Sequence, residues 1–191
     1  MIKIYLTIIL NRQDNYLSKK RIRNITKPKQ NISQPKHKDF SDRFYIDFTQ
    51  YPHWIDSINE KYFVNSLKDQ NEAAKKFYFI ISKIFPDLEE MGKDIFTSKY
   101  QHCHKIEGDK LITAKKIIKK IDNLDIGEDV NLWQISAKNA RNVRIVGSMV
   151  TSDMFIFYPL FIDYHHFLYS SKKYNQRDFK NNKFFPQEEY K

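Results

Sequence analysis

The chain has 191 residues, of which 41% are hydrophobic and 15% aromatic, and this suffices for one compact domain with extensions. Four glycines and six prolines exclude collagen-like and low-complexity classes. Lysine and arginine outnumber the acidic residues 33 to 23, and the net charge of +10 favours a polyanionic partner such as nucleic acid, or else simply keeps the chain soluble. The single cysteine, Cys103, excludes an internal disulfide and predicts a reducing, cytoplasmic environment.

The N-terminal segment is predicted to be neither a transmembrane span nor a signal peptide. Its apolar run, Ile2–Leu10, is too short to span a bilayer and is not followed by a small-residue cleavage site, so we expect a strand or a buried segment. A stretch rich in lysine and arginine follows, which is either a phosphate-binding arm or a solvated linker. The predicted organisation is an N-terminal strand and basic linker at 1–39, a single α+β domain at 40–174, and a basic tail at 175–191.

Hydrophobic periodicity predicts mostly helices in the first half of the folded part. In chain order we expect a strand at Phe44–Phe48, helices at Trp54–Leu67, Asn71–Phe85 and Leu88–Phe96, and a short strand at Tyr100–Ile106. The helix from Asn71 has the clearest apolar stripe, and Pro86 is expected to end it because proline lacks the backbone donor that a helix interior needs.

A helix and a three-stranded meander are predicted in the second half. The helix is expected at Leu111–Ile121, and the strands at Val130–Ile135, Val143–Val150 and Met154–Ile162. The third strand is apolar on both faces, as a central strand is. Pro159 within it predicts a bulge or an unpaired position. The fold class is therefore α+β, with helices packed on a small, mainly antiparallel sheet.

Polar side chains that can handle a phosphate surround the end of the third strand. Arg144 on the preceding strand can clamp a phosphate bidentately, or it can pair with Asp163. His165 and His166 can act as general acid or base near neutral pH, with Asp163 orienting a ring, and Tyr169 can take part in proton transfer. The alternative is an ordinary turn with two half-exposed histidines.

A second histidine pair, His102 and His104, points to one side if its segment is a strand. These two histidines can hold a metal together with Asp163 and His165, which is one alternative. A metal-free acid–base role or an RNA contact by His104 is another, and a pair of polar strand residues is the third. The first hypothesis uses no metal and no cofactor.

Lysine side chains form two candidate nucleic-acid contacts. Those on the polar face of the predicted helix 111–121 can hold phosphates without reading sequence, or they can be merely solvated. They are Lys115, Lys116, Lys119 and Lys120, and the polar stretch after Tyr169 adds Lys172 and Lys173. The sequence contains no Gly-rich phosphate loop and no GxSxG motif, which disfavours nucleotide-binding and serine hydrolase classes.

The run LWQIS…VRIVG…FYPLFIDYHHFLY, preceded by helices, resembles the RelE/ParE-like toxin superfamily, in particular a branch from low-GC bacteria. The resemblance covers residues 40–174. It rests on an upstream histidine pair, a Trp-bearing strand, an Arg-bearing strand and an apolar strand ending in Asp-x-x-His, here His102 with His104, Trp133, Arg144, and Asp163 with His166.

The resemblance implies a small sheet on helices and metal-free cleavage of RNA, often ribosome-bound mRNA, by attack of a ribose 2′-hydroxyl on the adjacent phosphate. It assigns base and acid roles to His166 or Tyr169 and charge stabilisation to Arg144, and it implies an acidic antitoxin as protein partner. Some branches bind gyrase instead. Two rivals stay open: a non-catalytic module that binds nucleic acid or protein, and a metal-dependent nuclease.

Overall fold

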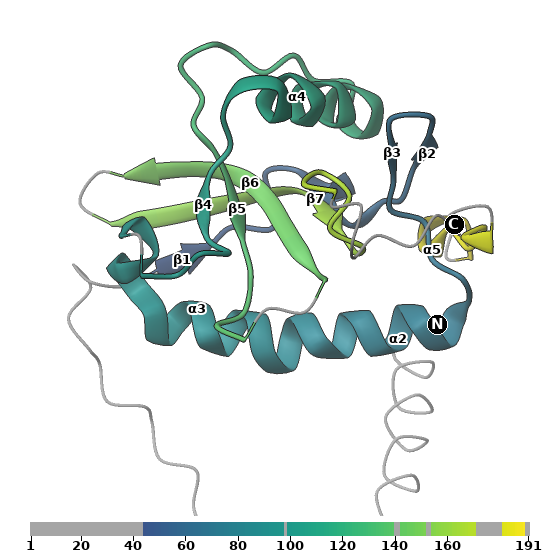
Figure 1. Cartoon of the computed structure of the whole chain (residues 1–191), viewed down its shortest axis with the longest axis horizontal. Helices are drawn as coiled ribbons and strands as arrows, with labels where there is room; N and C mark the ends of the chain where they lie inside the picture. Colours follow the sequence, from purple (N-terminus) through teal and green to yellow (C-terminus); the bar gives the residue numbers. More distant parts are fainter. Residues whose placement is uncertain (1–43, 98, 140–141, 152–153, 171–180, 190–191) are drawn as a thin grey trace, which may run out of the picture. The chain divides into compact units, whose positions relative to one another are not determined.

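The structure is a computed structural model that describes residues 44–97, 99–139, 142–151, 154–170 and 181–189 (Figure 1). Contacts divide the chain between His37 and Lys38, so every described residue belongs to the second of two units. The predictions for the N-terminal segment and basic linker, and those for Lys172 and Lys173, lie outside the described residues.

A five-stranded sheet with the order β1-β7-β6-β5-β4 forms the centre of the described unit. All neighbouring strands are antiparallel except β1, which runs parallel to β7. The strands are β1 (Phe44–Ile46), β4 (His104–Lys105), β5 (Leu132–Ile135), β6 (Arg144–Thr151) and β7 (Phe155–Asp163). The predicted meander is confirmed as β5-β6-β7, β7 lies between two partners as expected of an apolar strand, and the class is α+β.

The bulge predicted at Pro159 is confirmed. Val146 lies opposite Phe161 and Gly147 opposite Pro159, so Leu160 is the extra residue of β7. Proline cannot donate to the ladder, and the bulge absorbs that loss. Gly147 is required on the partner strand, because a Cβ atom there would collide with the carbonyl oxygen of Tyr158.

One long helical segment contradicts the prediction that Pro86 ends a helix. α2 (Gln70–Phe79) passes through a π-helical turn (Ile80–Ile84) into α3 (Phe85–Met91), followed by a 3₁₀ turn (Gly92–Phe96). The π turn lets the Phe85 N–H bond the Ile80 carbonyl. Pro86 thereby falls in the first turn of α3, where a missing N–H costs little.

The helix predicted at Trp54–Leu67 is wrong. The chain instead forms a short 3₁₀ turn (Pro52–Ile55) and a hairpin of β2 (Asn59–Glu60) with β3 (Phe63–Val64). The buried side chain of Asn65 organises this region. Its Oδ1 accepts from the Ile58 N–H at 2.6 Å, and its Nδ2 donates to the Ile162 carbonyl at 2.7 Å. A tertiary hydrogen-bond network therefore overrides the local helical periodicity.

The strand predicted at Tyr100–Ile106 is reduced to His104–Lys105, and His102 lies in the turn before it. The pair therefore does not share one strand, because only His104 is bound into the ladder, opposite Gln134.

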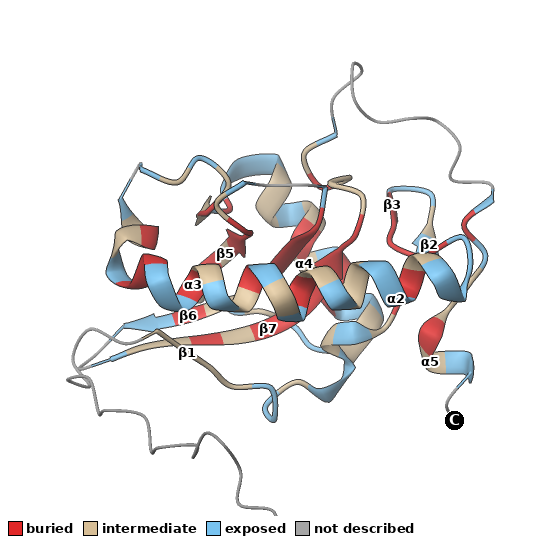
Figure 2. Ribbon diagram, turned by 90° about the horizontal axis from the view of Figure 1, so that it is seen from below, coloured by how far each residue is buried: buried red, intermediate tan, exposed pale blue. Residues whose placement is uncertain are grey.

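Helices cover both faces of the sheet (Figure 1). α4 (Gly108–Asp122), predicted from its apolar stripe, covers one face, where Ala114 and Ile118 meet Val146 in one apolar cluster. α2 and α3 cover the other face, where Ile80 joins Phe157 in a second cluster. Figure 2 shows buried residues running through the strands, with buried and exposed positions alternating along α2 and α3. No helix in the described ranges has both the length and the apolar character needed to span a membrane.

The described C-terminal segment, 181–189, packs on the same unit and ends in α5 (Pro186–Glu189). Phe184 and Leu67 exchange two backbone hydrogen bonds, at 3.0 and 2.8 Å. The side chain of Gln187 bonds both the backbone N–H and the carbonyl of Ser57. The sequence predicts a basic tail here that is irregular or weakly docked, and this part of it is docked.

Candidate functional site

Strand register brings three polar side chains to one face of the sheet. His104 on β4 lies opposite Gln134 on β5, and Gln134 lies opposite Val146 on β6. Arg144 is two residues before Val146 and shares its face, because side chains on a strand alternate. Val146 belongs to the apolar cluster that includes α4 residues. The three polar side chains therefore lie on the α4 side of the sheet.

The turn after β7 adds two aromatic side chains and completes what we call the histidine–tyrosine cluster: His102, His104, His166 and Tyr169. The rings of His104 and Tyr169 meet edge to face, with centroids 5.0 Å apart. The ring of His166 stacks on Tyr169 at 6.2 Å. Nδ1 of His102 lies 3.4 Å from Nη2 of Arg144. The structure thus brings together four of the predicted side chains and Arg144.

Asp163 builds the turn that carries the cluster. Its buried carboxylate accepts backbone N–H bonds from His165 (3.2 Å), Phe167 (2.9 Å) and Leu168 (2.8 Å). Burial raises the pKa of Asp163, against the opposing effect of these three donors. We expected Asp163 to orient a histidine ring, and it orients the backbone instead. Within this turn His166 takes the left-handed conformation, with φ of 59°.

The guanidinium of Arg144 is buried and bound within the protein. Nη1 donates to the Ser136 hydroxyl at 3.2 Å and to the Val143 carbonyl at 2.9 Å, and Nη2 faces His102. Burial lowers the pKa of Arg144, while the charge of Asp163, directly opposite on β7, raises it. The contact between Nη2 of Arg144 and Nδ1 of His102 therefore links Arg144 to the histidine–tyrosine cluster.

His165 is separated from the cluster although it adjoins His166 in sequence. Its Nε2 lies 2.9 Å from the Ser66 carbonyl and 3.2 Å from the Asn182 amide. Because Asp163 and His165 are engaged in this way, they do not complete a metal site with His102 and His104. Across the described ranges, no three His, Cys, Asp or Glu side chains are arranged to hold a metal ion.

The environment shifts the pKa values of His102, His166 and Tyr169. Burial, then the charge of Arg144 and the two other histidines, lowers the pKa of His166 to about 4. Burial and Arg144 also lower the pKa of His102. Burial, and then Glu107, raises the pKa of Tyr169. At pH 7 the imidazoles of His102 and His166 are therefore neutral, beside a protonated Tyr169 phenol.

Two residues of the site were missed in the sequence. Gln134 is buried beneath the cluster, with Nε2 3.3 Å from Nε2 of His104. The signal was a lone amide within the otherwise apolar strand LWQI. Lys110, in the first turn of α4, places its Nζ 5.8 Å from the ring centroid of Tyr169. Its proximity depends on tertiary structure, and no local pattern marks it.

The four lysines predicted on α4 lie on its polar face, and three of them contact other groups of the protein. Lys119 pairs with Asp125 at 2.6 Å, and Lys120 pairs with Glu60 at 2.8 Å. Lys115 donates to the Gly127 carbonyl at 3.2 Å, and Lys116 is exposed. Exposed ion pairs of this kind are weak, so these lysines can still exchange partners for phosphates.

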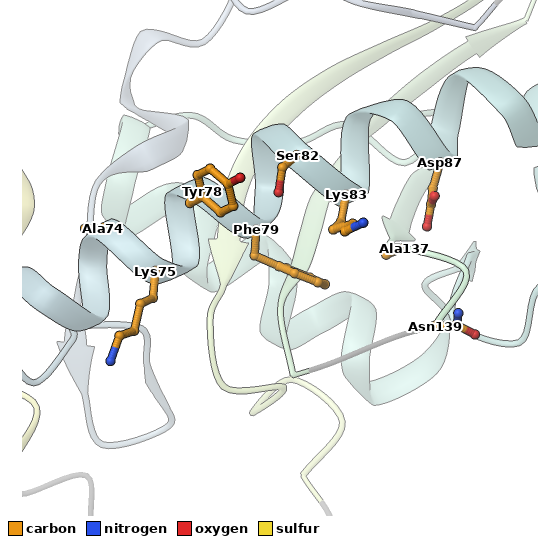
Figure 3. A pocket seen from close by; sticks show the side chains of 9 residues that line it. All are labelled: Ala74, Lys75, Tyr78, Phe79, Ser82, Lys83, Asp87, Ala137 and Asn139. Carbon is orange, nitrogen blue, oxygen red and sulfur yellow. The ribbon is translucent and has the colours of Figure 1, made fainter.

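A cavity of about 820 Å³ lies along α2 and the π turn, beside the start of the β5–β6 connection (Figure 3). Tyr78, Lys75 and Lys83 line it from the helical side, and Ala137 and Asn139 line it from the connection. None of the predicted catalytic side chains lines this cavity among the described residues. We therefore take the chemistry of the histidine–tyrosine cluster, and not cavity size, as the guide to function.

Comparison with known proteins identifies a family without stating an activity. The profile of the family described as "Uncharacterised protein UU032" matches residues 50–191. A protein of Ureaplasma parvum serovar 3, described in the same words, is 27% identical over 175 residues, which cover 90% of this chain and 95% of that protein. No solved structure matches the chain.

Proposed function

The chain belongs to the UU032 family, and we propose that it acts on RNA, cutting the phosphodiester backbone by metal-free acid–base chemistry. One observation carries the proposal. His166, whose pKa is lowered to about 4, stacks on Tyr169, whose pKa is raised. At pH 7 the imidazole is neutral and the phenol is protonated, which are the states that a general base and a general acid need before the reaction.

The proposed reaction is an internal transesterification. The imidazole of His166 takes the proton of a ribose 2′-hydroxyl, and the 2′-oxygen forms a bond to the adjacent phosphorus. The bond from phosphorus to the 5′-oxygen breaks, and the phenol of Tyr169 gives its proton to that oxygen. The products are a 2′,3′-cyclic phosphate and a 5′-hydroxyl, so atoms and charge balance without a metal.

His102 is proposed to stabilise the phosphate. Its Nδ1 faces the Arg144 guanidinium, which only donates hydrogen bonds, so the proton of the neutral ring resides on Nε2. That N–H can donate to a phosphate oxygen, and the positive charge of Arg144 makes it a stronger donor. Lys110, close to Tyr169, adds a second positive charge. The net charge of +10 favours a polyanionic substrate.

We extend the proposal to a RelE/ParE-like toxin on the strength of the sequence resemblance. In that case the substrate is mRNA, including ribosome-bound mRNA, the protein partner is an acidic antitoxin, and the site of action is the cytoplasm. Induced expression should then arrest growth, and His166→Asn should relieve the arrest at equal protein level.

One observation favours a second candidate function, a non-catalytic module that binds RNA or protein. The guanidinium of Arg144 is buried and hydrogen-bonded within the protein, and it does not stand open to a phosphate. Cleavage would use an accessible cation to stabilise the charge that develops on the phosphate, whereas a site that only binds RNA or protein does not need one.

The experiment is RNA cleavage by the full chain in EDTA-containing buffer and in a translating extract with controlled magnesium. We expect cleavage with cyclic phosphate ends in wild type, and a loss of about 10²-fold or more in His166→Asn and Tyr169→Phe. His53→Asn is the matched control, because His53 is exposed and its ring pairs with Asp56 in the same turn. Cleavage abolished by EDTA in buffer would contradict the metal-free reaction. RNA binding without cleavage under either condition would leave the binding module.

A further inference from the structure

Gln134 is a buried amide whose hydrogen bonding is incomplete. It is 1% exposed, in the middle of β5. Its Nε2 meets His104, and its Oε1 is buried with no hydrogen-bond partner among the described residues. A buried acceptor without a partner costs stability, and an apolar side chain of similar size would avoid that cost. Packing alone therefore does not account for glutamine at this position.

The contacts of His104 fix the location of its proton. Nδ1 lies 3.0 Å from the carbonyl oxygen of Lys105, which can only accept, so Nδ1 carries the hydrogen in the neutral ring. Nε2 is then a lone-pair acceptor, and the amide N–H of Gln134 donates to it at 3.3 Å. Both ring nitrogens are thus engaged, and the ring is held edge to face against Tyr169.

We propose that Gln134 is a positioning residue for Tyr169 that acts through His104. Its amide fixes the plane of the His104 ring and selects the tautomer with the proton on Nδ1, and the fixed ring holds the phenol of Tyr169 in place. The role assigned to Tyr169 rests on the proposed function, whereas the tautomer and the packing do not.

The unpaired Oε1 gives this pair a second hydrogen-bonding state. If Nε2 of His104 becomes protonated, a half-turn of the amide presents Oε1 as its acceptor, and no other hydrogen bond of Oε1 is broken. Charged or titratable groups from several elements belong to the histidine–tyrosine cluster or interact with it. They are His102 in the turn before β4, Arg144 on β6, His166 and Tyr169 in the turn after β7, and Glu107 and Lys110 at the start of α4.

The test is nitrogen NMR of the His104 ring in the full chain, with carbon NMR of the Tyr169 ring. In wild type we expect a pyrrole-like shift at Nδ1 and a pyridine-like shift at Nε2. Gln134→Met keeps the volume and removes the donor, so the Nε2 shift should move and the two tautomers should mix. Gln134→Glu offers only acceptors, so Nε2 should become protonated. The Tyr169 ring signals should move in both variants.

Ser148→Ala is the matched control, because Ser148 lies on the same sheet face of the adjacent strand and should leave both rings unchanged. A wild-type His104 that is protonated at Nε2 only, or His104 and Tyr169 signals unaltered in folded Gln134→Met, would overturn the proposal.

Cleavage kinetics separate the two proposals. Gln134→Met should lower kcat by about 10²-fold with little change in KM, as a misplaced catalytic group does. If wild type does not cleave RNA, the proposed nuclease fails, and the NMR result still decides the positioning of His104 and Tyr169. If wild type cleaves and Gln134→Met is as active as wild type, the positioning role fails and the nuclease stands.

Discussion

His166 shows how one backbone conformation can separate two adjacent histidines. Its positive φ, in a turn held by the Asp163 carboxylate, is uncommon for residues other than glycine, although Asn, Asp and His adopt it more often than the rest. The turn sends His166 to Tyr169 and leaves His165 bonded to Ser66. Burial at this place, and then the charge of Arg144, lowers the pKa of His166.

Stability should fall with acid because of His166. Its pKa is about 4 in the folded protein and 6.5 for an unperturbed histidine, so the unfolded chain binds more protons between these values. The free energy of unfolding should therefore decrease as the pH falls through about 6.5 towards 4. His166→Asn keeps a residue that tolerates positive φ and removes the titration, so its pH dependence should be shallower.

Denaturant unfolding at several pH values in this window measures the effect. His102 and His165 also have lowered pKa values, so part of the slope should survive in the variant. His53→Asn serves again as control. An identical slope in wild type and His166→Asn would show that His166 does not titrate as its environment indicates.

At the scale of elements, the β6–β7 pair is organised around a proline that a central strand does not normally hold. The bulge at Leu160 shifts the register by one residue, and it is this shift that aligns Arg144 with Asp163 at the end of the pair. The close approach of Tyr158 to Gly147 belongs to the same irregularity.

Gly147→Ala should therefore destabilise the fold. The new Cβ would collide with the carbonyl oxygen of Tyr158 and the Phe157 ring, and the backbone oxygen cannot move aside as a flexible side chain would. We expect a loss of about 1–3 kcal/mol, or more if β6 must shift. Thermal and denaturant unfolding measure it, with Ser148→Ala on the neighbouring position as control. If Gly147→Ala lowers the free energy of unfolding no more than Ser148→Ala does, then β6 and β7 can move apart at this point without a cost in stability.

Two element predictions failed because tertiary contacts override local signals. Pro86 predicted a helix end, but a π turn before it moves the proline into a helical first turn. The apolar spacing at Trp54–Leu67 predicted a helix, but the buried Asn65 amide holds a hairpin against β7. In both cases the pattern marked some residues that are buried, such as Phe63 and Ile84, and others that are exposed, such as Tyr62 and Ile81, because the local geometry it assumed was wrong.

At the scale of the whole described unit, a late segment closes the structure against early ones. Residues 181–189 bond to Leu67 through Phe184 and to Ser57 through Gln187. The carbonyl of Asn182 accepts from the Ser66 hydroxyl at 2.7 Å. Ser66 also holds His165, so the C-terminal segment and the turn after β7 share partners.

Truncation after residue 180 should destabilise the protein by several kcal/mol, at about 1 kcal/mol for each lost hydrogen bond together with exposure of Leu67. Gln187→Ala should cause an intermediate loss, because it removes two of these bonds. Melting temperature and denaturant unfolding measure both variants. A truncated chain as stable as wild type would contradict the docking of this segment.

The sequence alone determined the meander, the α4 helix, the bulge at Pro159 and the candidate side chains, because alternation, amphipathic spacing and proline chemistry act over a few residues. Tertiary structure decided which candidates meet. Strand register joined His104 and Arg144 on one face, the Asp163 turn brought His166 and excluded His165, and Gln134 acquired its importance only from its partner across the ladder. These contacts join segments far apart in sequence, so local patterns carry no information about them.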